Sequence, residues 1–481
     1  MKGKALTWND SSIEDRMQFS PDEVFAAGLR HFQIANTAYP INHNLTLNPY
    51  VVPESKIQDH ISWVWQDVDE LLLYAHVPFC AHICAFCELS VVKPKYIATD
   101  TDPYFDALQK EIAMYAQNFG TRKRVLWFDI GWWTPSIVDT RYIADVIETV
   151  DKNFSLADNM RMSIETTPKI ASDQPTKMAD YHKMGIRRIS MWVQSLSWKI
   201  IGRADTSVAY NKNAAGNIRK AGFDQFNVDV MYGFSGQDDA DVEATLHHVI
   251  DELQPDFITL YPMRYKGTVI EKKSKDIYAT QLTTQYNLAY QMITWGWYVI
   301  RPGKNTCSKI AGNDGLSDYL HHRVLHGTPY LGFGLGAQSF NPSNNLSYNQ
   351  WAHLKHNAEY IKQINEWLFP IQDAHHLSRE AAMGKMIAIS FFYGGIHVQS
   401  FEKIFWETLQ QVFPRELQYI IEHDLMEYLD DGVLQLTKKW VENYSGVISI
   451  FYSPATKKYL LELWEKWWMG KSFSIRDLTN V

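Results

Sequence analysis

The chain has 481 residues and a formal net charge of −8 at pH 7, with 54 acidic side chains against 46 Lys and Arg. This length exceeds that of one typical domain. The excess of acidic side chains gives no indication of a positively charged surface that would bind nucleic acid or an anionic membrane. Only four cysteines occur, three of them clustered, which argues against a disulfide framework and for a reducing, cytoplasmic setting. Neither a secretory signal pattern nor an apolar run of roughly 20 residues is visible, so no membrane association is expected.

Residues 1–69 mix polar and aromatic residues and are punctuated by prolines. Only Pro21–Gln33 has the pattern of a helix, with acidic residues in its first turn. We interpret residues 1–69 as an N-terminal extension that packs on the following domain.

From residue 70 onward, strand-like and helix-like segments alternate six times with short connections. The strand segments are Leu71–His76, Val125–Ile130, Met160–Ile164, Arg188–Val193, Phe226–Met231 and Asp256–Tyr261. The helical segments between them are Tyr104–Asn118, Tyr142–Asn153, Lys177–Met184, Asn213–Ala221 and Val242–Glu252. This alternation predicts an α/β fold, a partial (β/α)6 TIM-like barrel over residues 70–345. A polar or glycine motif follows each strand, at the barrel end that carries chemistry.

After the sixth strand the pattern changes. A helix is predicted at Thr280–Thr294. The stretch Tyr330–Phe340 appears too rich in glycine for an ordinary strand interior, and we expect it to bring backbone close to a ligand. For residues 346–481 the sequence pattern predicts a small α+β accessory domain, with short strands at Val433–Leu436 and Val447–Phe451.

Three cysteines follow the first strand at the spacing C-x3-C-x2-C, namely Cys80, Cys84 and Cys87. Three crowded thiolates are soft ligands suited to iron and sulfide. A four-iron cubane with three protein ligands leaves one iron open to an exogenous chelator. The cysteines therefore predict a [4Fe-4S] cluster of that kind.

Six motifs occur in order: YAHVPFC, GWWTPS, SIETTP, RRISMWVQS, NVDVMYGFSGQ and YLGFGLGAQSF. Together with the cysteine spacing, they resemble the oxygen-independent coproporphyrinogen III oxidase family of radical S-adenosylmethionine (SAM) enzymes. The resemblance runs from about Leu71 to Phe340 and is weaker after His375. This family includes porphyrinogen decarboxylases, haem chaperones, haem-ring-opening methyltransferases, and methyltransferases or cyclopropanases of natural-product pathways.

The resemblance implies that Cys80, Cys84 and Cys87 hold the cluster and that SAM chelates its open iron. It places Tyr74 with them at the catalytic centre. It implies SAM-binding roles for Phe86, Gly131, Thr134, Glu165, Gln194, Arg203, Asp229, Tyr232, Gly334 and Ala337. The implied partners are a small-molecule substrate and a flavodoxin or ferredoxin as electron donor. In related one-carbon transferases a second SAM binds beside the first.

Two departures from the family pattern bear on the reaction. The porphyrinogen and haem-chaperone branches place a cysteine two positions after the third ligand, whereas Glu88-Leu89 follows Cys87 here. The family's GGGTP turn carries Trp132 and Trp133, which put ordinary SAM binding in doubt. Our first interpretation is therefore methylation or cyclopropanation of a small aromatic or polyene substrate. The alternatives are a tetrapyrrole enzyme, oxidising propionates or opening a haem ring, and a non-enzymatic haem chaperone.

Overall fold

The computed structural model arranges the chain around one large sheet and one small sheet. The described residues are 18–29, 39–40, 43–82, 84–87, 92, 97–131, 134–197, 200, 207–265, 267–277, 279–302, 304–347, 355–391, 395–439 and 444–467. Within them, the large sheet has eleven strands in the order β11-β10-β9-β8-β1-β2-β3-β4-β5-β6-β7. Strands β1 to β6 pair in chain order and in parallel, which confirms the predicted partial barrel.

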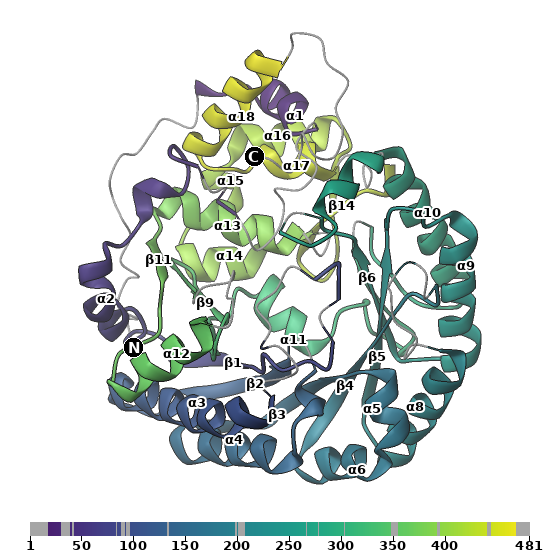
Figure 1. Cartoon of the computed structure of the whole chain (residues 1–481). Coiled ribbons are helices and arrows are strands. Elements are labelled where there is room, and N and C mark those ends of the chain that lie inside the picture. Colours follow the sequence, from purple (N-terminus) through teal and green to yellow (C-terminus); the bar gives the residue numbers. More distant parts are fainter. Residues whose placement is uncertain are drawn as a thin grey trace.

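Helices form an outer layer around these six strands (Figure 1). The strands are β1 (Glu70–His76), β2 (Arg124–Gly131), β3 (Ser155–Thr166), β4 (Ile186–Gln194), β5 (Gln225–Tyr232) and β6 (Phe257–Pro262). The helices between them are α3 (Ile97–Phe119), α4 (Thr140–Asn153), α5 (Pro168–Asp173), α6 (Pro175–Lys183), α8 (Val208–Ala221), α9 (Asp239–His247) and the π-helix η6 (His248–Leu253). Each predicted strand and helix of the barrel is present.

The barrel strands are buried on both faces, as β1 illustrates. Leu71 and Leu73 belong to the core between the sheet and the outer helices. Leu72 and Tyr74 instead pack inside the barrel with Trp127 of β2. Because successive side chains of a strand alternate between faces, one continuous apolar run fills two cores.

Further strands extend both edges of the parallel sheet. On one edge β7 (Thr306–Ser308) runs antiparallel to β6. On the other, β8 (Tyr330–Phe333) runs parallel to β1 and leads into antiparallel β9 (Gln338–Asn341), β10 (Asn344–Ser347) and β11 (Asp373–His376). The expectation that Tyr330–Phe340 avoids strand structure is therefore wrong on both sides of its glycine turn. Glycine suits this strand because a Cβ atom at Gly332 would lie 2.4 Å from the Gln338 carbonyl oxygen.

Helices of different lengths connect these edges. They are η7 (Glu271–Asp276), α10 (Ala279–Trp295), α11 (Asp318–Leu320), the π-helix η8 (His321–Leu325) and α12 (Lys355–Asn365). The predicted helix Thr280–Thr294 is confirmed as α10. In Figure 1, α11 lies inside the arc formed by the barrel strands.

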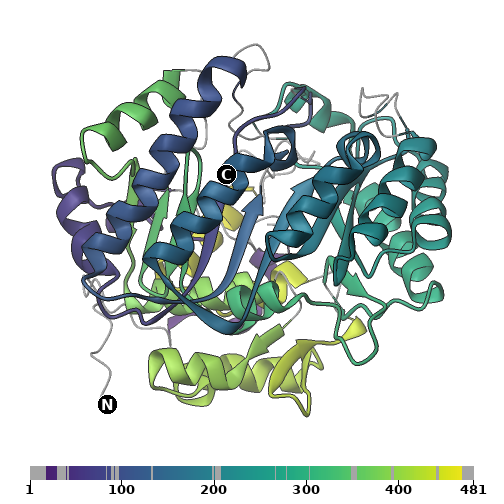
Figure 2. The same cartoon turned by 90° about the horizontal axis from the view of Figure 1, so that it is seen from below.

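The C-terminal region has its own hydrophobic core and three-stranded antiparallel sheet. Its elements are α13 (Arg379–Phe391), β12 (Gly395–His397), α14 (Val398–Phe405), α15 (Leu409–Val412), α16 (Pro414–Glu422), β13 (Met426–Tyr428), β14 (Val433–Leu436), α17 (Tyr444–Ser449) and α18 (Pro454–Trp467). In the turned view, part of this region projects beyond one end of the barrel (Figure 2).

One predicted strand of this region is wrong. Residues Val447–Phe451 contain the end of helix α17 and the turn after it. All residues of α17 after Tyr444 are buried, and Gly446 lets Leu29 and Phe25 approach its backbone. A helix buried on all sides loses the polar face that would reveal its period.

The segment before β1 divides its packing between two cores. Helix α1 (Pro21–Gly28) lies in the C-terminal core, and α2 (Ile57–Val64) lies in the barrel core. Two short 3-10 helices, η2 (Asn48–Tyr50) and η3 (Glu54–Lys56), lie between them. The predicted helix Pro21–Gln33 ends at Gly28, and residues 30–33 lie outside the described residues. The division into residues 1–69, 70–345 and 346–481 stays a prediction.

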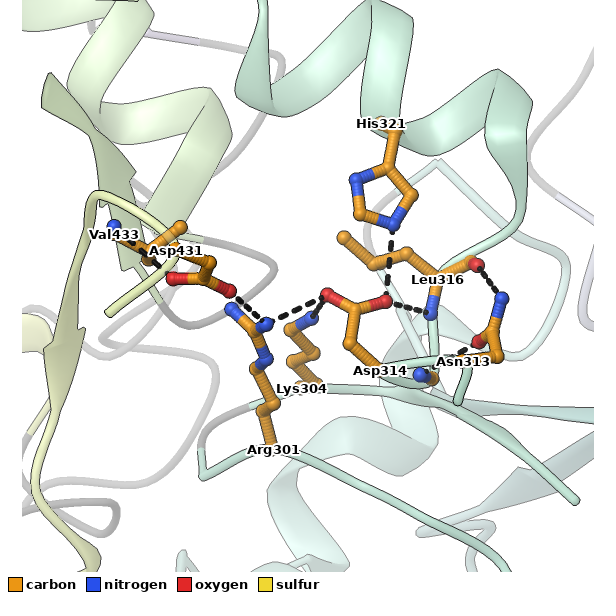
Figure 3. A network of polar contacts seen from close by, with 9 residues as sticks. Arg301, Lys304, Asn313, Asp314, Leu316, His321, Asp431 and Val433 are labelled. Atoms are coloured by element: carbon orange, nitrogen blue, oxygen red, sulfur yellow. Dashed lines mark hydrogen bonds and ion pairs between the residues drawn. The ribbon is translucent and has the colours of Figure 1, made fainter. Parts of the chain in front are cut away.

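A network of charges joins the barrel to the turn between β13 and β14 (Figure 3). Asp314 accepts from Arg301 and Lys304, each at 3.2 Å, and lies 3.0 Å from the His321 ring nitrogen. Arg301 also pairs with Asp431 of the C-terminal region. Burial lowers the pKa of Lys304 to about 8. Burial would raise the pKa of Asp314, but the His321 hydrogen bond and the Lys304 charge lower it overall.

No helix in the described ranges combines the length and apolar character needed to cross a membrane.

Candidate active site

The three cysteines lie in the loop after β1. A bridge between Phe79 and Val92 closes this loop at its base. Cys80 and Cys84 are buried, and Cys87 is half-buried with its N–H bonded to the Cys84 carbonyl at 3.1 Å. The loop therefore places three thiols at the carboxyl end of the first barrel strand.

The first cysteine borders the end of β2. Its sulfur lies 3.5 Å from Thr134 Oγ1, just before the short helix η5 (Pro135–Ile137). A pocket of about 150 Å³ opens beside them and is also lined by His82 and Lys169. Cys80 and Thr134, expected at one site, are thus neighbours.

Gly131, Glu165 and Tyr74 also meet at this end of the barrel. A Cβ atom at Gly131 would lie 3.1 Å from Glu165 Oε1 and 3.4 Å from Tyr74 Cε2. Glycine here lets three neighbouring strands bring these groups together. Tyr74 OH lies 3.2 Å from His76 Nδ1, and burial raises the pKa of Tyr74 far enough to keep its phenol neutral.

Gln194 ends β4 in an unusual conformation. Its φ of 63° lies in the left-handed region, at a register shift between β4 and β5. Such a conformation costs about 1–3 kcal/mol and clusters at functional sites. The side chain is buried, and its Oε1 has no hydrogen-bond partner among the described residues. A buried acceptor left open in this way is suited to a bound molecule.

Asp229 points into the barrel from β5 with a partner on its own strand. Its Oδ1 accepts from Asn227 Nδ2 at 2.9 Å, and Thr259 donates to Asn227 Oδ1 at 3.0 Å. Burial raises the pKa of Asp229 to about 6, although Asn227 and Arg188 act in the opposite direction. The hydrogen bond from Asn227 thus offsets part of the free-energy cost of burying the Asp229 carboxylate.

Several polar side chains inside the barrel were not predicted. Ser163 accepts from Trp127 Nε1 at 2.9 Å and donates to Asp129. Arg188 donates to Ser190 Oγ at 2.9 Å. All of these are polar residues at alternate positions of otherwise apolar strands, a signal that could have found them.

Arg323 reaches the same interior without such a signal. It comes from η8, donates to Tyr319 OH at 2.9 Å and lies over the Tyr330 ring at 4.3 Å. Its charge lowers the pKa of Asp129, although burial raises that pKa overall. Only the tertiary fold brings this π-helix to the barrel interior.

Two of the expected site residues belong to aromatic pairs. The ring of Phe86, in the cysteine loop, lies 5.4 Å from that of Phe234, which follows β5. The Tyr232 ring lies 6.3 Å from that of Tyr286 of α10, and burial raises the pKa of Tyr232. Phe86 thus links the cysteine loop to the end of β5.

Gly334 and Ala337 lie on either side of the turn between β8 and β9. Gly334 has a φ of 95°, which favours glycine. Ala337 is buried against the interior cluster that contains Tyr74 and Tyr330. The stretch Tyr330–Phe340 therefore lies beside β1, where a role in the predicted SAM site requires it.

Three residues of the predicted site lie outside the described residues, namely Arg203, Trp132 and Trp133. Their roles stay predictions.

A larger cavity of about 1200 Å³ lies away from these residues. It is lined by Glu70 and Arg124, at the amino ends of β1 and β2, and by His397 and Lys403 of the C-terminal region. The cysteines lie at the opposite ends of the strands, so cavity size does not mark the candidate site.

Residues 74–249 match the Radical SAM superfamily. This match runs from β1 to the π-helix η6. It is 30% identical over 202 residues to the oxygen-independent coproporphyrinogen III oxidase of Synechocystis, covering 40% of this chain and 41% of that oxidase. It is 24% identical over 391 residues to the heme chaperone HemW of Lactococcus lactis, covering 79% of this chain and 96% of that chaperone. The matched region thus spans less than half of the Synechocystis relative.

The same fold occurs in a solved structure. Coproporphyrinogen III oxidase (HemN) from Escherichia coli, a radical SAM enzyme, aligns with a TM-score of 0.68 at 21% identity. The alignment covers 84% of this chain and 95% of that structure. The radical SAM barrel and the C-terminal region therefore follow one shared architecture.

Radical SAM proteins use a [4Fe-4S] cluster and SAM, and the residues of this chain fit both. The loop supplies three thiols, the donors such a cluster takes. In the described part of the chain no three His, Cys, Asp or Glu side chains surround one metal position. A cubane does not require that arrangement, because each thiolate binds a different iron. The open Oε1 of Gln194 would be available as an acceptor for SAM at the same end of the barrel.

Proposed function

We propose that this radical SAM enzyme acts on a tetrapyrrole and oxidises propionate side chains, as a coproporphyrinogen dehydrogenase does. The observation that carries the proposal is a pair of arginines inside the barrel, Arg188 of β4 and Arg323 of η8. Arg188 and Arg323 both lower the pKa of Asp129, and the charge of Arg323 also acts on Lys385. Lys385 itself lies on α13 of the C-terminal region, where it donates to the Tyr39 carbonyl at 2.7 Å. Such cations suit a substrate that carries several carboxylates better than an apolar polyene.

The relatives support the same choice. The Synechocystis relative is described as a coproporphyrinogen III oxidase, and neither it nor the Lactococcus relative is described as a methyltransferase. Methyl transfer, our first interpretation from the sequence, therefore ranks below tetrapyrrole oxidation. The absence of a cysteine two positions after Cys87 departs from the porphyrinogen branch. The product assay must therefore show whether this chain decarboxylates a porphyrinogen.

In this proposal the three cysteines hold the cluster, and Gln194 and Glu165 lie where they can accept from the amine or ribose of SAM. When bound, the cluster and SAM would supply the one-electron chemistry that hydrogen removal from the substrate needs. Tyr74 stays neutral beside Glu165 and can donate a hydrogen bond without adding charge. Phe86 and Phe234 cover the loop with apolar surface that limits water. A low-potential donor such as flavodoxin or ferredoxin would supply the electron.

A haem chaperone is the second candidate. The observation that favours it is coverage, because the match to HemW of Lactococcus lactis spans 96% of that protein. In that case the same barrel would bind haem, and no turnover of SAM would follow.

The test is anaerobic incubation of reconstituted protein with dithionite, SAM and coproporphyrinogen III, followed by mass spectrometry. Tetrapyrrole oxidation predicts 5′-deoxyadenosine together with a decarboxylated porphyrinogen. S-adenosylhomocysteine or methylthioadenosine would indicate one-carbon transfer instead. A stable Soret band with haem and no SAM cleavage would favour the chaperone. The matched variants are Cys84→Ala, which should be inactive, and Cys307→Ala, which should be active because Cys307 lies on β7 and donates to the Ile258 carbonyl.

A further inference from the structure

A buried carboxylate on α3 holds the glycine turn between β8 and β9. Glu111 is 2% exposed, yet its partners come from distant parts of the chain. Its Oε2 accepts from the backbone N–H of Gly334 at 2.8 Å and from Tyr360 OH of α12 at 2.7 Å. One side chain therefore joins α3, α12 and the turn.

The turn has no room to move toward β1. A Cβ atom at Gly334 would lie 2.4 Å from Tyr104 OH and 2.8 Å from the His76 carbonyl oxygen. Tyr104 donates to that same oxygen at 2.8 Å and accepts from the Leu335 N–H at 3.1 Å. Tyr104 and Glu111 lie two helical turns apart on α3, so a single helix holds the turn at two points.

This arrangement bears directly on the cysteine loop. His76 is the last residue of β1, and Cys80 follows four positions later. On the other side of the turn, Ala337 packs in the interior cluster with Tyr74. A shift of the turn would therefore move the end of β1 and the tyrosine beside Glu165.

We propose that Glu111 is a positioning residue, which holds the turn of residues 334–336 against the carboxyl end of β1 and thereby sets the geometry of the SAM site. The SAM part of this inference rests on the proposed function, whereas the position of the turn does not. A carboxylate suits the task because one oxygen can accept from the backbone and the tyrosine together. Removing it would leave a buried N–H and a buried O–H unsatisfied.

The experiment compares two Glu111 variants with a control of similar burial elsewhere. Glu111→Gln keeps an amide oxygen that can accept both hydrogen bonds, and Glu111→Ala removes the acceptor. The control is Glu416→Ala in the C-terminal core, where Glu416 is 4% exposed and accepts from Lys457 at 2.7 Å. Amide hydrogen exchange is measured in the apoprotein, and SAM binding by equilibrium dialysis after anaerobic reconstitution.

Glu111→Ala is expected to raise exchange of the amides of residues 334–338 and to weaken SAM binding about tenfold, since a buried donor loses its partner. Glu111→Gln should restore both. Glu416→Ala should change neither the amide exchange at the turn nor SAM binding, even if its melting temperature falls as much as that of Glu111→Ala. Equal effects of Glu111→Ala and Glu416→Ala, or unchanged exchange at the turn in Glu111→Ala, would overturn the inference.

Two outcomes separate this inference from the proposed function. If the wild-type protein binds no SAM, the proposed function fails, and exchange at the turn alone decides the role of Glu111. If Glu111→Ala does not fold, Tyr360→Phe replaces it, because it removes one of the two donors and leaves the carboxylate in place. Faster exchange at the turn in Tyr360→Phe would support the role, and unchanged exchange would refute it.

Discussion

Replacing Glu111 by Gln should remove a pH dependence of stability that the buried carboxyl creates. Burial raises its pKa from 4.5 to about 7, although the hydrogen bonds from Tyr360 and Gly334 act in the opposite direction. A group whose pKa is raised in the folded state contributes stability fully below its unfolded pKa. That contribution is lost as the pH rises to the folded pKa, because the unfolded chain ionises first. About 2.5 pH units at 1.36 kcal/mol each give a loss of about 3 kcal/mol.

The assay is denaturant unfolding of the apoprotein and of the Glu111→Gln variant between about pH 5 and about pH 8. Other groups titrate alike in both proteins, so the difference in unfolding free energy isolates Glu111. Tyr104 and Tyr115, which face the carboxyl, have pKa values raised well above their usual 10 and do not titrate here. The variant should gain about 3 kcal/mol on the wild type as the pH rises through this range, with no further gain above pH 7. Parallel stability curves would refute the reasoning.

Four further variants test the site and the interface. Cys84→Ala should abolish the absorbance of the [4Fe-4S] cluster at about 400 nm. An intact absorbance band would refute the assignment of Cys84 as a cluster ligand. Gln194→Gly removes the open acceptor and should weaken SAM binding in dialysis, whereas it should relieve the positive φ of the backbone. Unchanged affinity would exclude a SAM contact. Asp314→Asn should cost about 3 kcal/mol in denaturant unfolding, because it leaves a buried lysine unpaired. Asp431→Asn, at the half-exposed end of the network, should cost less than about 1 kcal/mol, and equal costs would contradict the buried role of Asp314.

The sequence allowed the barrel to be predicted because its strands are short, apolar and bounded by turns. Met160–Ile164 illustrates the limit, since β3 begins at Ser155 and its first half mixes polar and apolar residues without a period of two. The edge strands could not be predicted in the same way. Strand β8 depends on pairing with β1, which lies about 250 residues earlier in the chain, and its glycines hide the pattern.

The candidate site shows a similar division. Cys80, Cys84 and Cys87 could be found from spacing alone, because thiolate ligands leave a local signature. The position of Gln194 beside β5 follows from the strand alternation, but its strained backbone does not. Arg323 was invisible, because nothing within η8 indicates that this segment crosses to the barrel interior.

Two tyrosines approach each other where the C-terminal region meets the barrel. Burial raises the pKa of Tyr444, the first residue of α17, to about 12, while Arg264, just after β6, lowers it. Tyr444 in turn adds to the raised pKa of Tyr232, so the two tyrosines lie close enough to interact. The cysteine loop can serve any radical reaction that starts from SAM. The proximity of Tyr444 to Tyr232, at the end of β5, instead depends on how the C-terminal region packs on the barrel. Under the proposed function, a substrate that reaches both Tyr444 and the arginines inside the barrel would be large and anionic, as a tetrapyrrole is and a small polyene is not.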